Sequence, residues 1–336
     1  MISTTALVFL ALLLIGCAAA IFIDPYYGIL LYVFEYFLNP VERWWWQDIP
    51  NAPYAFIIGV VIFLAFIIRH DRYVDIQTWS FSPTKWFFLL IVIMIIILPY
   101  SFVPAKHQEY TILMAKYFVL YCIIVKTINT PKKFEQLVSV YLIGQFYIGW
   151  LAFNKGRAHG RLEGIGGPDS YNSNHAAALL VIAAPLLIHY VINGTKWQKI
   201  GALFIAAFVL NAIILINSRG AFVALAVSTA FFIFQYLKAK SNLKIKKSWV
   251  VLATALCLGL FLYLTEDVFW QRMSTLQDTS TEGSGYRMLI WASAFDMARD
   301  YPFGVGRRGF AYLSPQYVPS ELLAKQTGTR AVHNTF

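Results

Sequence analysis

The sequence contains few charged residues: Asp, Glu, Lys and Arg make up only 13% of the 336 residues. A soluble domain carries about 25%. Hydrophobic residues make up 59% of the chain, and the mean hydropathy is +0.60. This composition excludes an ordinary soluble domain and indicates a polytopic integral membrane protein.

Cysteines and metal-binding motifs are also scarce. Cys17, Cys122 and Cys257 each lie inside an apolar run, so their spacing predicts neither a disulfide framework nor a thiolate metal site. The histidines are scattered, without HxxxH or paired-carboxylate spacing. We expect no bound metal and no cofactor. The net charge of +10 forms no basic stripe, which argues against a nucleic-acid partner.

Apolar runs of about 15 to 20 residues recur along the chain and predict an all-α fold with about ten transmembrane helices. The expected spans are 4–23, 26–38, 53–68, 86–100, 111–125, 137–153, 176–192, 200–217, 221–237 and 249–265. Residues 1–265 would then form a multi-span transmembrane domain. Residues 266–336 are predicted to form a long extracytoplasmic loop near the C-terminus that carries the chemistry.

The second expected span, 26–38, is short and follows the helix-breaking pair Asp24-Pro25. It is long enough only for a tilted or half-buried helix. Glu35 lies near its Asn39-Pro40 end, and we interpret it as an interfacial carboxylate. The tryptophan-rich stretch 42–50 that follows is interpreted as an anchor in the membrane interface.

Basic residues in the short loops set the predicted orientation. They concentrate in four loops, at 69–85, 126–133, 196–199 and 238–247. The excess of Lys and Arg in such loops marks the cytoplasmic side. The loops at 101–110, 154–175 and 218–220 and the terminal loop would then face the opposite side. We therefore expect a multi-pass membrane protein, surrounded by membrane lipids, with an extracytoplasmic active site.

Arginines on this outer side are the candidate ligands for an anionic substrate. Arg161 lies in a glycine-rich loop that ends at the helix-capping residues 172–174, where an anion is favoured. An ordinary loop with a capped helix explains the same pattern equally well. Arg219 lies between two apolar runs with almost no loop, so its charge should pair with a ligand or reach the interface.

The terminal loop is predicted to contain a helix from about Tyr286 to Arg299. On this helix Ser293, Asp296 and Asp300 would form one solvated polar face. Arg287 would lie on the opposite stripe and face the surface on which the helix packs. It would bind substrate there or form a buried pair with a carboxylate.

Two further features complete the terminal loop. The sequence FGVGRRGF predicts a tight glycine turn that exposes Arg307 and Arg308. His333 lies in TRAVHNTF, where its neutral imidazole could accept a proton from a hydroxyl nucleophile. A histidine in a loop is also often incidental.

The order of these pieces resembles a known family. SRGA at 218–221, YRMLIW, YPFGVGRRGF and the closing HNTF together resemble the O-antigen ligase and O-antigen polymerase superfamily. The earlier stretch DPYYGILLYVFEYFLNP resembles the O-glycosylation ligase branch associated with exosortase systems.

The resemblance implies a glycosyltransferase that inverts configuration and needs no metal. Such enzymes move a glycan from a polyprenyl-diphosphate carrier to a hydroxyl of a lipid, protein or glycan acceptor. They act on the outer side of the bacterial inner membrane, which is therefore the location that the resemblance implies. Arg161 and Arg219 would bind the diphosphate, and His333 would be the general base. Arg287 matches an arginine before the tryptophan of the loop.

The chain departs from the family pattern in two places. PDSYNSNHA stands where a compact Pro-Asn pair is common, and the family continues with further spans after its histidine motif. We therefore expect the chain to be truncated. The alternative function is a transporter or flippase of a lipid-linked glycan or anion. A transporter is expected to carry its polar residues at mid-membrane, whereas here they gather on one side.

Overall fold

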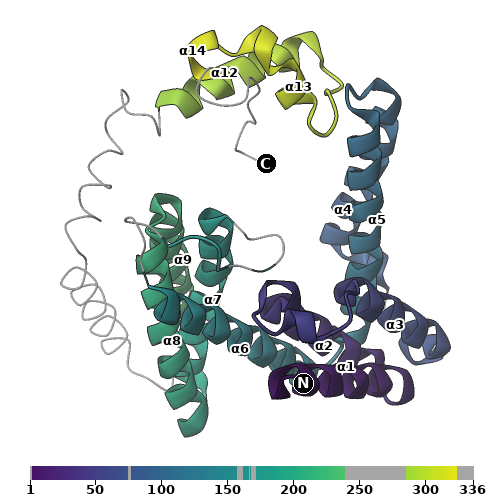
Figure 1. The fold of residues 1–336 in the computed structure, drawn as a ribbon, viewed down its shortest axis with the longest axis vertical. Coiled ribbons are helices and arrows are strands. Elements are labelled where there is room, and N and C mark those ends of the chain that lie inside the picture. The colour runs from purple at the N-terminus through teal and green to yellow at the C-terminus, as the bar shows by residue number, and fades with distance from the viewer. Residues whose placement is uncertain are drawn as a thin grey trace. The chain divides into compact units, whose positions relative to one another are not determined.

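The computed structural model describes residues 2–74, 77–156, 162–165, 167, 172–238 and 285–323. Within these ranges the chain folds into helices, without a strand (Figure 1). The chain divides into two compact units. Unit 1 comprises Met1–Arg69 and Ile128–Arg272, and unit 2 comprises His70–Thr127 and Met273–Phe336.

Unit 1 is built around the short helix α2. Helix α2 packs against α1, α3 and α6, while α8 packs against α6 and α7, and α7 also contacts α9. Among the described residues of unit 1, the α-helices are α1 (Thr4–Phe22), α2 (Pro25–Leu38), α3 (Tyr54–Ile68), α6 (Pro131–Lys155), α7 (Ser173–Asn193), α8 (Lys196–Ile216) and α9 (Arg219–Lys238). Two short 3-10 helices, η1 (Pro40–Glu42) and η2 (Trp46–Asp48), lie between α2 and α3.

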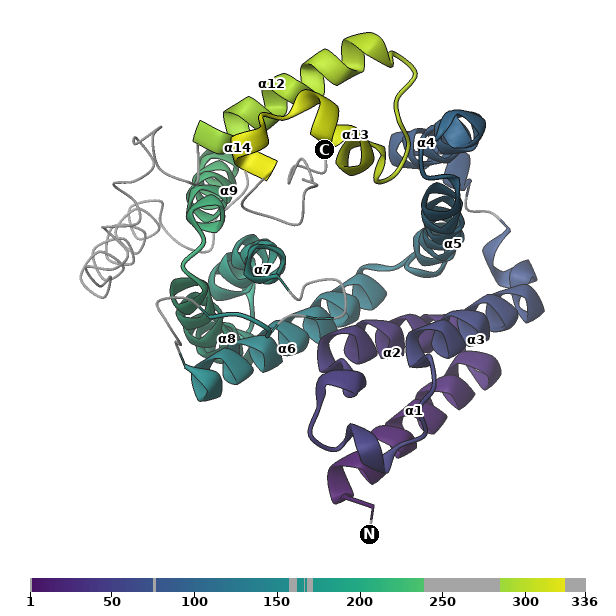
Figure 2. The ribbon, with the colours of Figure 1, turned by 45° about the horizontal axis from the view of Figure 1, so that its top comes forward.

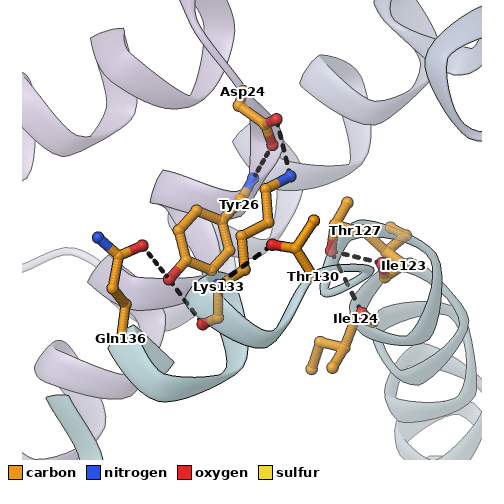
Figure 3. Close-up of polar contacts among 8 residues, drawn as sticks. All are labelled: Asp24, Tyr26, Ile123, Ile124, Thr127, Thr130, Lys133 and Gln136. Carbon is orange, nitrogen blue, oxygen red and sulfur yellow. Dashed lines mark hydrogen bonds and ion pairs between the residues drawn. The ribbon is translucent and has the colours of Figure 1, made fainter. Parts of the chain in front are cut away.

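The break between α1 and α2 is also a tertiary contact (Figure 3). Asp24 caps α2 by accepting the Tyr26 N–H at 2.9 Å, and Pro25 occupies the first helical position. The other carboxylate oxygen of Asp24 lies 3.0 Å from the Lys133 ammonium of α6. The Tyr26 hydroxyl lies 2.8 Å from the Lys133 carbonyl and 3.1 Å from the side-chain carbonyl of Gln136. These contacts fix the start of α2 to the start of α6.

Small residues allow the helices of unit 1 to approach closely. A Cβ added to Gly28 would lie 2.6 Å from Ile62 Cγ1. A Cβ added to Gly149 would lie 2.8 Å from the backbone carbonyl carbon of Phe208. Close approach through glycine is typical of helices packed in a membrane. It brings α2 against α3 and α6 against α8.

Unit 2 contains a hairpin of two long helices and a cluster of three shorter ones. Helix α4 (Ser82–Ile97) continues through η5 (Leu98–Tyr100) and turns into α5 (Pro104–Thr127). The shorter helices are α12 (Gly285–Asp300), α13 (Gly309–Tyr317) and α14 (Ser320–Leu323). They share a buried cluster of Ile290, Val318 and Leu322. The 3-10 helices η3 (His70–Tyr73) and η4 (Thr78–Ser80) precede α4.

Helices occupy nine of the ten expected spans, and the tenth, 249–265, lies outside the described residues. Within the described part of the chain, six helices are long and apolar enough to cross a membrane: α1, α4 with η5, α5, α6, α7 and α8. The number rises to seven if α3 and the segment after it form one span. Helix α2, with 14 residues, and the apolar part of α9 are shorter. A count of ten spans therefore stays a prediction.

Three expectations about exposure were wrong. The stripe of α12 that was expected to pack on a surface is exposed at Trp291, which is 40% exposed, and at Ala298, because the helix packs through its opposite stripe. Glu35 is 6% exposed, because α2 is enclosed by neighbouring helices and does not lie at the rim of the unit. Ser293 is also 6% exposed, because Ile290 and Met297 on the same stripe of α12 are buried. The Ser293 hydroxyl donates to the Leu289 carbonyl at 3.0 Å, which makes its burial inexpensive.

Candidate functional site

One end of unit 1 gathers the two loops predicted to lie on the outer side, 154–175 and 218–220, together with the start of α1 and the loop before α3. The Ser3 N–H donates to Asp48 Oδ2 at 3.0 Å, which joins the start of α1 to the loop before α3. The Lys155 ammonium at the end of α6 donates to the Glu163 carbonyl at 2.7 Å. The Leu162 N–H donates to the Leu215 carbonyl, near the end of α8, at 3.0 Å. The helix ends are thus connected by hydrogen bonds.

The start of α7 is capped as the sequence predicts. Asn172 is the N-cap, and its side-chain oxygen accepts the Asn174 N–H at 2.9 Å. The Ser173 N–H lies 3.4 Å from Glu163 Oε2. The Ser173 side chain is 1% exposed, and its hydroxyl has no hydrogen-bond partner among the described residues. A buried hydroxyl in this state is one that a ligand or a water could satisfy.

The start of α9 meets the start of α7. Helix α8 ends at Asn217, which has left-handed backbone angles (φ 52°, ψ 49°) and reverses the chain within two residues. Ser218 then donates its hydroxyl to Asn174 Oδ1 at 3.0 Å, across 44 residues of sequence. We call residues 172–175 and 217–219 the α7–α9 junction. Because Arg219 is the first residue of α9, its backbone belongs to this junction.

Two helix N-termini therefore lie together at the α7–α9 junction. Helices α7, α8 and α9 are neighbours (Figure 2), and α7 and α9 are 21 and 20 residues long. Each N-terminus carries about half a positive charge. At α7 the N–H groups of the first turn are already occupied, by Glu163 Oε2, Asn172 Oδ1 and the Asn172 carbonyl. Glu163 opposes this field, since its carboxylate occupies one N–H of α7. Glu163 neutralises part of the positive field of the two N-termini. The geometry therefore favours a ligand that carries more than one negative charge.

The predicted site residues are only partly covered by the structure. Arg161 and His333 lie outside the described residues. Arg219 and Arg287 are described as helical positions, the first residue of α9 and the third residue of α12. They belong to different units. Their substrate-binding roles stay predictions.

In unit 2 the glycine turn of the terminal segment docks on the end of the α4–α5 hairpin. Gly304 and Gly306 have positive φ values of 90° and 74°, and Arg307 and Arg308 are exposed as predicted. We call residues 304–308 the arginine turn. The Phe102 N–H donates to the Val305 carbonyl at 3.3 Å. The turn is therefore attached to the hairpin through its backbone.

His107 is a second attachment point, which sequence analysis missed. It is 4% exposed, and its Nδ1 accepts the Arg307 N–H at 3.0 Å. Its Nε2 lies 2.8 Å from the Met94 carbonyl. Since a carbonyl only accepts, Nε2 carries the proton and the imidazole is neutral. The Arg307 guanidinium lies over the Tyr110 ring at 4.3 Å. No local signal links residues 200 positions apart.

The fold and the junction define a class: a polytopic helical membrane protein with a candidate anion site where two helix N-termini meet. A family comparison narrows this class. Residues 201–336 match the family described as O-antigen ligase. This match supports the O-antigen ligase superfamily, and the matched part includes Arg219, Arg287 and His333. No curated protein and no solved structure shows significant similarity to the chain.

Proposed function

We propose that the protein transfers a glycan from a polyprenyl-diphosphate carrier to an acceptor hydroxyl. The transfer would invert configuration at the anomeric carbon and require no metal. The acceptor would be a lipid, a protein or a growing glycan. The family match supports glycan transfer in general. The finer assignment, to the exosortase-associated O-glycosylation ligase branch, rests on the resemblance of the N-terminal stretch alone.

The observation that carries this proposal is the hydrogen bond from Ser218 to Asn174. It joins the N-terminus of α7 to the N-terminus of α9, whose first residue is Arg219, and this supports an anion site at the junction. A diphosphate carries the kind of concentrated negative charge that helix N-termini and arginine bind without a metal. Arg161 would add a second guanidinium from the loop before α7.

In the proposed reaction, the acceptor oxygen attacks the anomeric carbon from the side opposite the diphosphate. The new glycosidic C–O bond forms as the C–O bond to the diphosphate breaks. The diphosphate leaves with the bonding electron pair and is stabilised by the arginines. His333 would take the hydroxyl proton of the acceptor as general base, a role that contributes about 10²- to 10⁴-fold in rate. Arg287 would bind substrate from α12.

The contacts within each unit support the predicted sidedness. In unit 1 the predicted outer segments share one end, while Arg69 contacts the Ile21 carbonyl and Lys133 contacts Asp24. In unit 2 the predicted outer loop 101–110 contacts the arginine turn. Ser280→Cys tests the topology. We expect it to react with a membrane-impermeant thiol reagent when only the outer barrier is open. Labelling that requires a broken inner membrane would reverse the assignment.

Replacement of Arg219 tests the anion site. Arg219→Lys keeps the charge but loses the planar fork, so donor affinity should fall, and Arg219→Ala should reduce it further. The matched control is Arg299→Lys, because Arg299 is exposed and pairs only locally with Asp296 at 3.0 Å. Donor binding is measured with the purified protein and a lipid-linked glycan. If Arg219→Ala binds the donor and turns over as the wild type does, Arg219 is not part of the anion site.

Two experiments test the chemical step. His333→Gln should nearly abolish transfer while donor binding persists, and the lipid-linked donor should accumulate. A variant that transfers at the wild-type rate with the same pH profile would show that His333 is not the base. Transfer should also survive EDTA. A loss that Mg²⁺ or Mn²⁺ restores would instead point to a metal site.

A further inference from the structure

A pocket in unit 1 lies between the loop before α3 and the last turns of α6. Its volume is about 400 Å³, within the range of about 300 to 1,000 Å³ that is typical of small-molecule sites. The loop contributes residues 42–45, and we call residues 39–53 the tryptophan loop. The side chains that matter for the argument are Glu42, Arg43, Trp44, Tyr147, Trp150 and Asn154.

The tryptophan loop is held in place before any ligand binds. Trp45 is 3% exposed and packs on Phe9, with 5.4 Å between the ring centroids. Asp48 accepts the Ser3 N–H at 3.0 Å. The Arg43 Nε–H donates to the Leu38 carbonyl at 2.6 Å. Because Trp45 is anchored in the core, the neighbouring Trp44 is presented outward and is 77% exposed.

The α6 wall presents aromatic faces beside polar groups. The rings of Tyr147 and Trp150 are stacked, with centroids 6.4 Å apart and an interplanar angle of 24°. The Arg43 guanidinium lies over the Tyr147 ring at 5.0 Å. Its Nη2 has no hydrogen-bond partner among the described residues. Burial lowers the pKa of Arg43, yet an arginine remains charged near neutral pH.

We propose that this pocket binds a sugar ring of the transferred or accepting glycan. A sugar ring has apolar C–H faces, which pack on the negative face of an aromatic ring, and hydroxyls around its edge. Trp44 and Trp150 supply the ring faces. Arg43, Glu42 and Asn154 supply donors and acceptors for the hydroxyls. The choice of a sugar rests on the proposed function.

The position of the pocket agrees with this assignment. Asn154 and Trp150 lie on the last turns of α6, and the next residue, Lys155, donates to the Glu163 carbonyl. Glu163 in turn contacts Ser173 at the α7–α9 junction. A glycan whose diphosphate occupies the junction therefore extends along the same end of unit 1 as the pocket. An interfacial anchor would not require polar side chains such as Arg43, Glu42 and Asn154 to line the same pocket as the aromatic rings.

Direct sugar binding tests the proposal without any transfer reaction. The purified full chain is applied to an array of defined lipid-free bacterial oligosaccharides, and affinities are measured for those it binds. Trp44→Ala and Trp150→Ala should each weaken binding about tenfold, through the loss of one stacked ring face. Trp197→Ala is the matched control, since Trp197 is 79% exposed and starts α8 at the opposite end from the junction. Its affinity should equal that of the wild type.

Each outcome decides between the alternatives. Failure to bind any oligosaccharide, or equal binding by the wild type, Trp44→Ala and Trp150→Ala, would overturn the proposal. Phosphatidylglycerol vesicles serve as the second probe. If the two replacements weaken vesicle binding but not sugar binding, the pocket is a lipid anchor. If sugar binding depends on Trp44 but the protein has no transfer activity, the pocket is a sugar-binding site and only the proposed function is refuted. In an active protein, a raised KM for donor or for acceptor identifies which glycan the pocket holds.

Discussion

Replacing Gly306 by alanine should detach the arginine turn from the α4–α5 hairpin. Gly306 has φ +74°, which costs an alanine about 1 kcal/mol in backbone strain. A Cβ at this position would also lie 2.7 Å from Ser101 Cβ and 3.2 Å from Ser101 Cα. The turn must move to relieve this contact and would lose the hydrogen bond from Arg307 to His107, worth about 1 kcal/mol.

The expected sum, about 2 kcal/mol, corresponds to roughly 30-fold in a local opening equilibrium. Hydrogen exchange followed by mass spectrometry measures this opening at the Arg307 amide. Gly156→Ala is the matched control, because Gly156 has φ +64° and open space around it. Because Gly156 has ψ −170°, an alanine there costs about 1 to 3 kcal/mol in strain alone, so exchange at its own amide should be at least about fivefold faster, with no change at Arg307.

A second-site change isolates the steric part of the effect. Ser101→Gly removes the side chain that the new Cβ would meet, so it should restore most of the protection in the Gly306→Ala background. Ser101→Gly alone is measured as well, because the Ser101 hydroxyl accepts the Val103 N–H at 3.3 Å. Unchanged exchange at Arg307 in Gly306→Ala, or no recovery with Ser101→Gly, would refute the packing of the turn on the hairpin.

Three further predictions concern single contacts. His107→Phe keeps a ring but removes both nitrogens, so exchange at the Arg307 amide should rise about tenfold, whereas His189→Phe on the exposed side of α7 should leave it unchanged. Glu163→Gln removes the charge that opposes the α7 N-terminus, so donor affinity should rise about threefold; weaker binding would place the diphosphate elsewhere. Hydrogen bonds from the Ser3 hydroxyl and backbone N–H lower the pKa of Asp48. Their stabilisation is complete above the unfolded-state pKa and is lost as pH falls through the lower folded-state pKa. In Asp48→Asn the unfolding midpoint temperature should therefore fall less steeply as the pH is lowered than it does in the wild type. The same pH dependence in both proteins would contradict this.

Features set by local sequence were predicted well. Helix positions follow from apolar runs, the break at Asp24-Pro25 follows from backbone restriction, and the cap at Asn172 follows from its side chain. The exposure of Arg307 and Arg308 follows from the glycines of the turn. Each of these features depends on residues within a few positions of one another.

Features set by tertiary contact were not predictable. Nothing near Ser218 in sequence indicates Asn174, and nothing near His107 indicates Arg307. Glu35 was interpreted as interfacial because it lies near the end of its helix, and Ser293 was placed on a solvated face because it shares a helical stripe with Asp296 and Asp300, yet both are buried. Their burial depends on which neighbours enclose α2 and α12, and that information is spread over the whole chain. The roles of Arg161 and His333 stay predictions because both residues lie outside the part of the chain that the structure describes.

Unit 2 is formed by two segments that lie far apart in the sequence, and this affects the order in which its contacts form during synthesis. The hairpin of α4 and α5 is made first, but its partner, the arginine turn, follows 200 residues later. At about 5 to 20 residues per second, the ribosome needs roughly 10 to 40 s to reach Arg307. Throughout that time Nδ1 of His107 and the Phe102 N–H cannot form these hydrogen bonds, because Val305 and Arg307 have not yet been synthesised. The end of the hairpin is thus the last part of the α4–α5 pair to be completed, after α6 to α9 have been made.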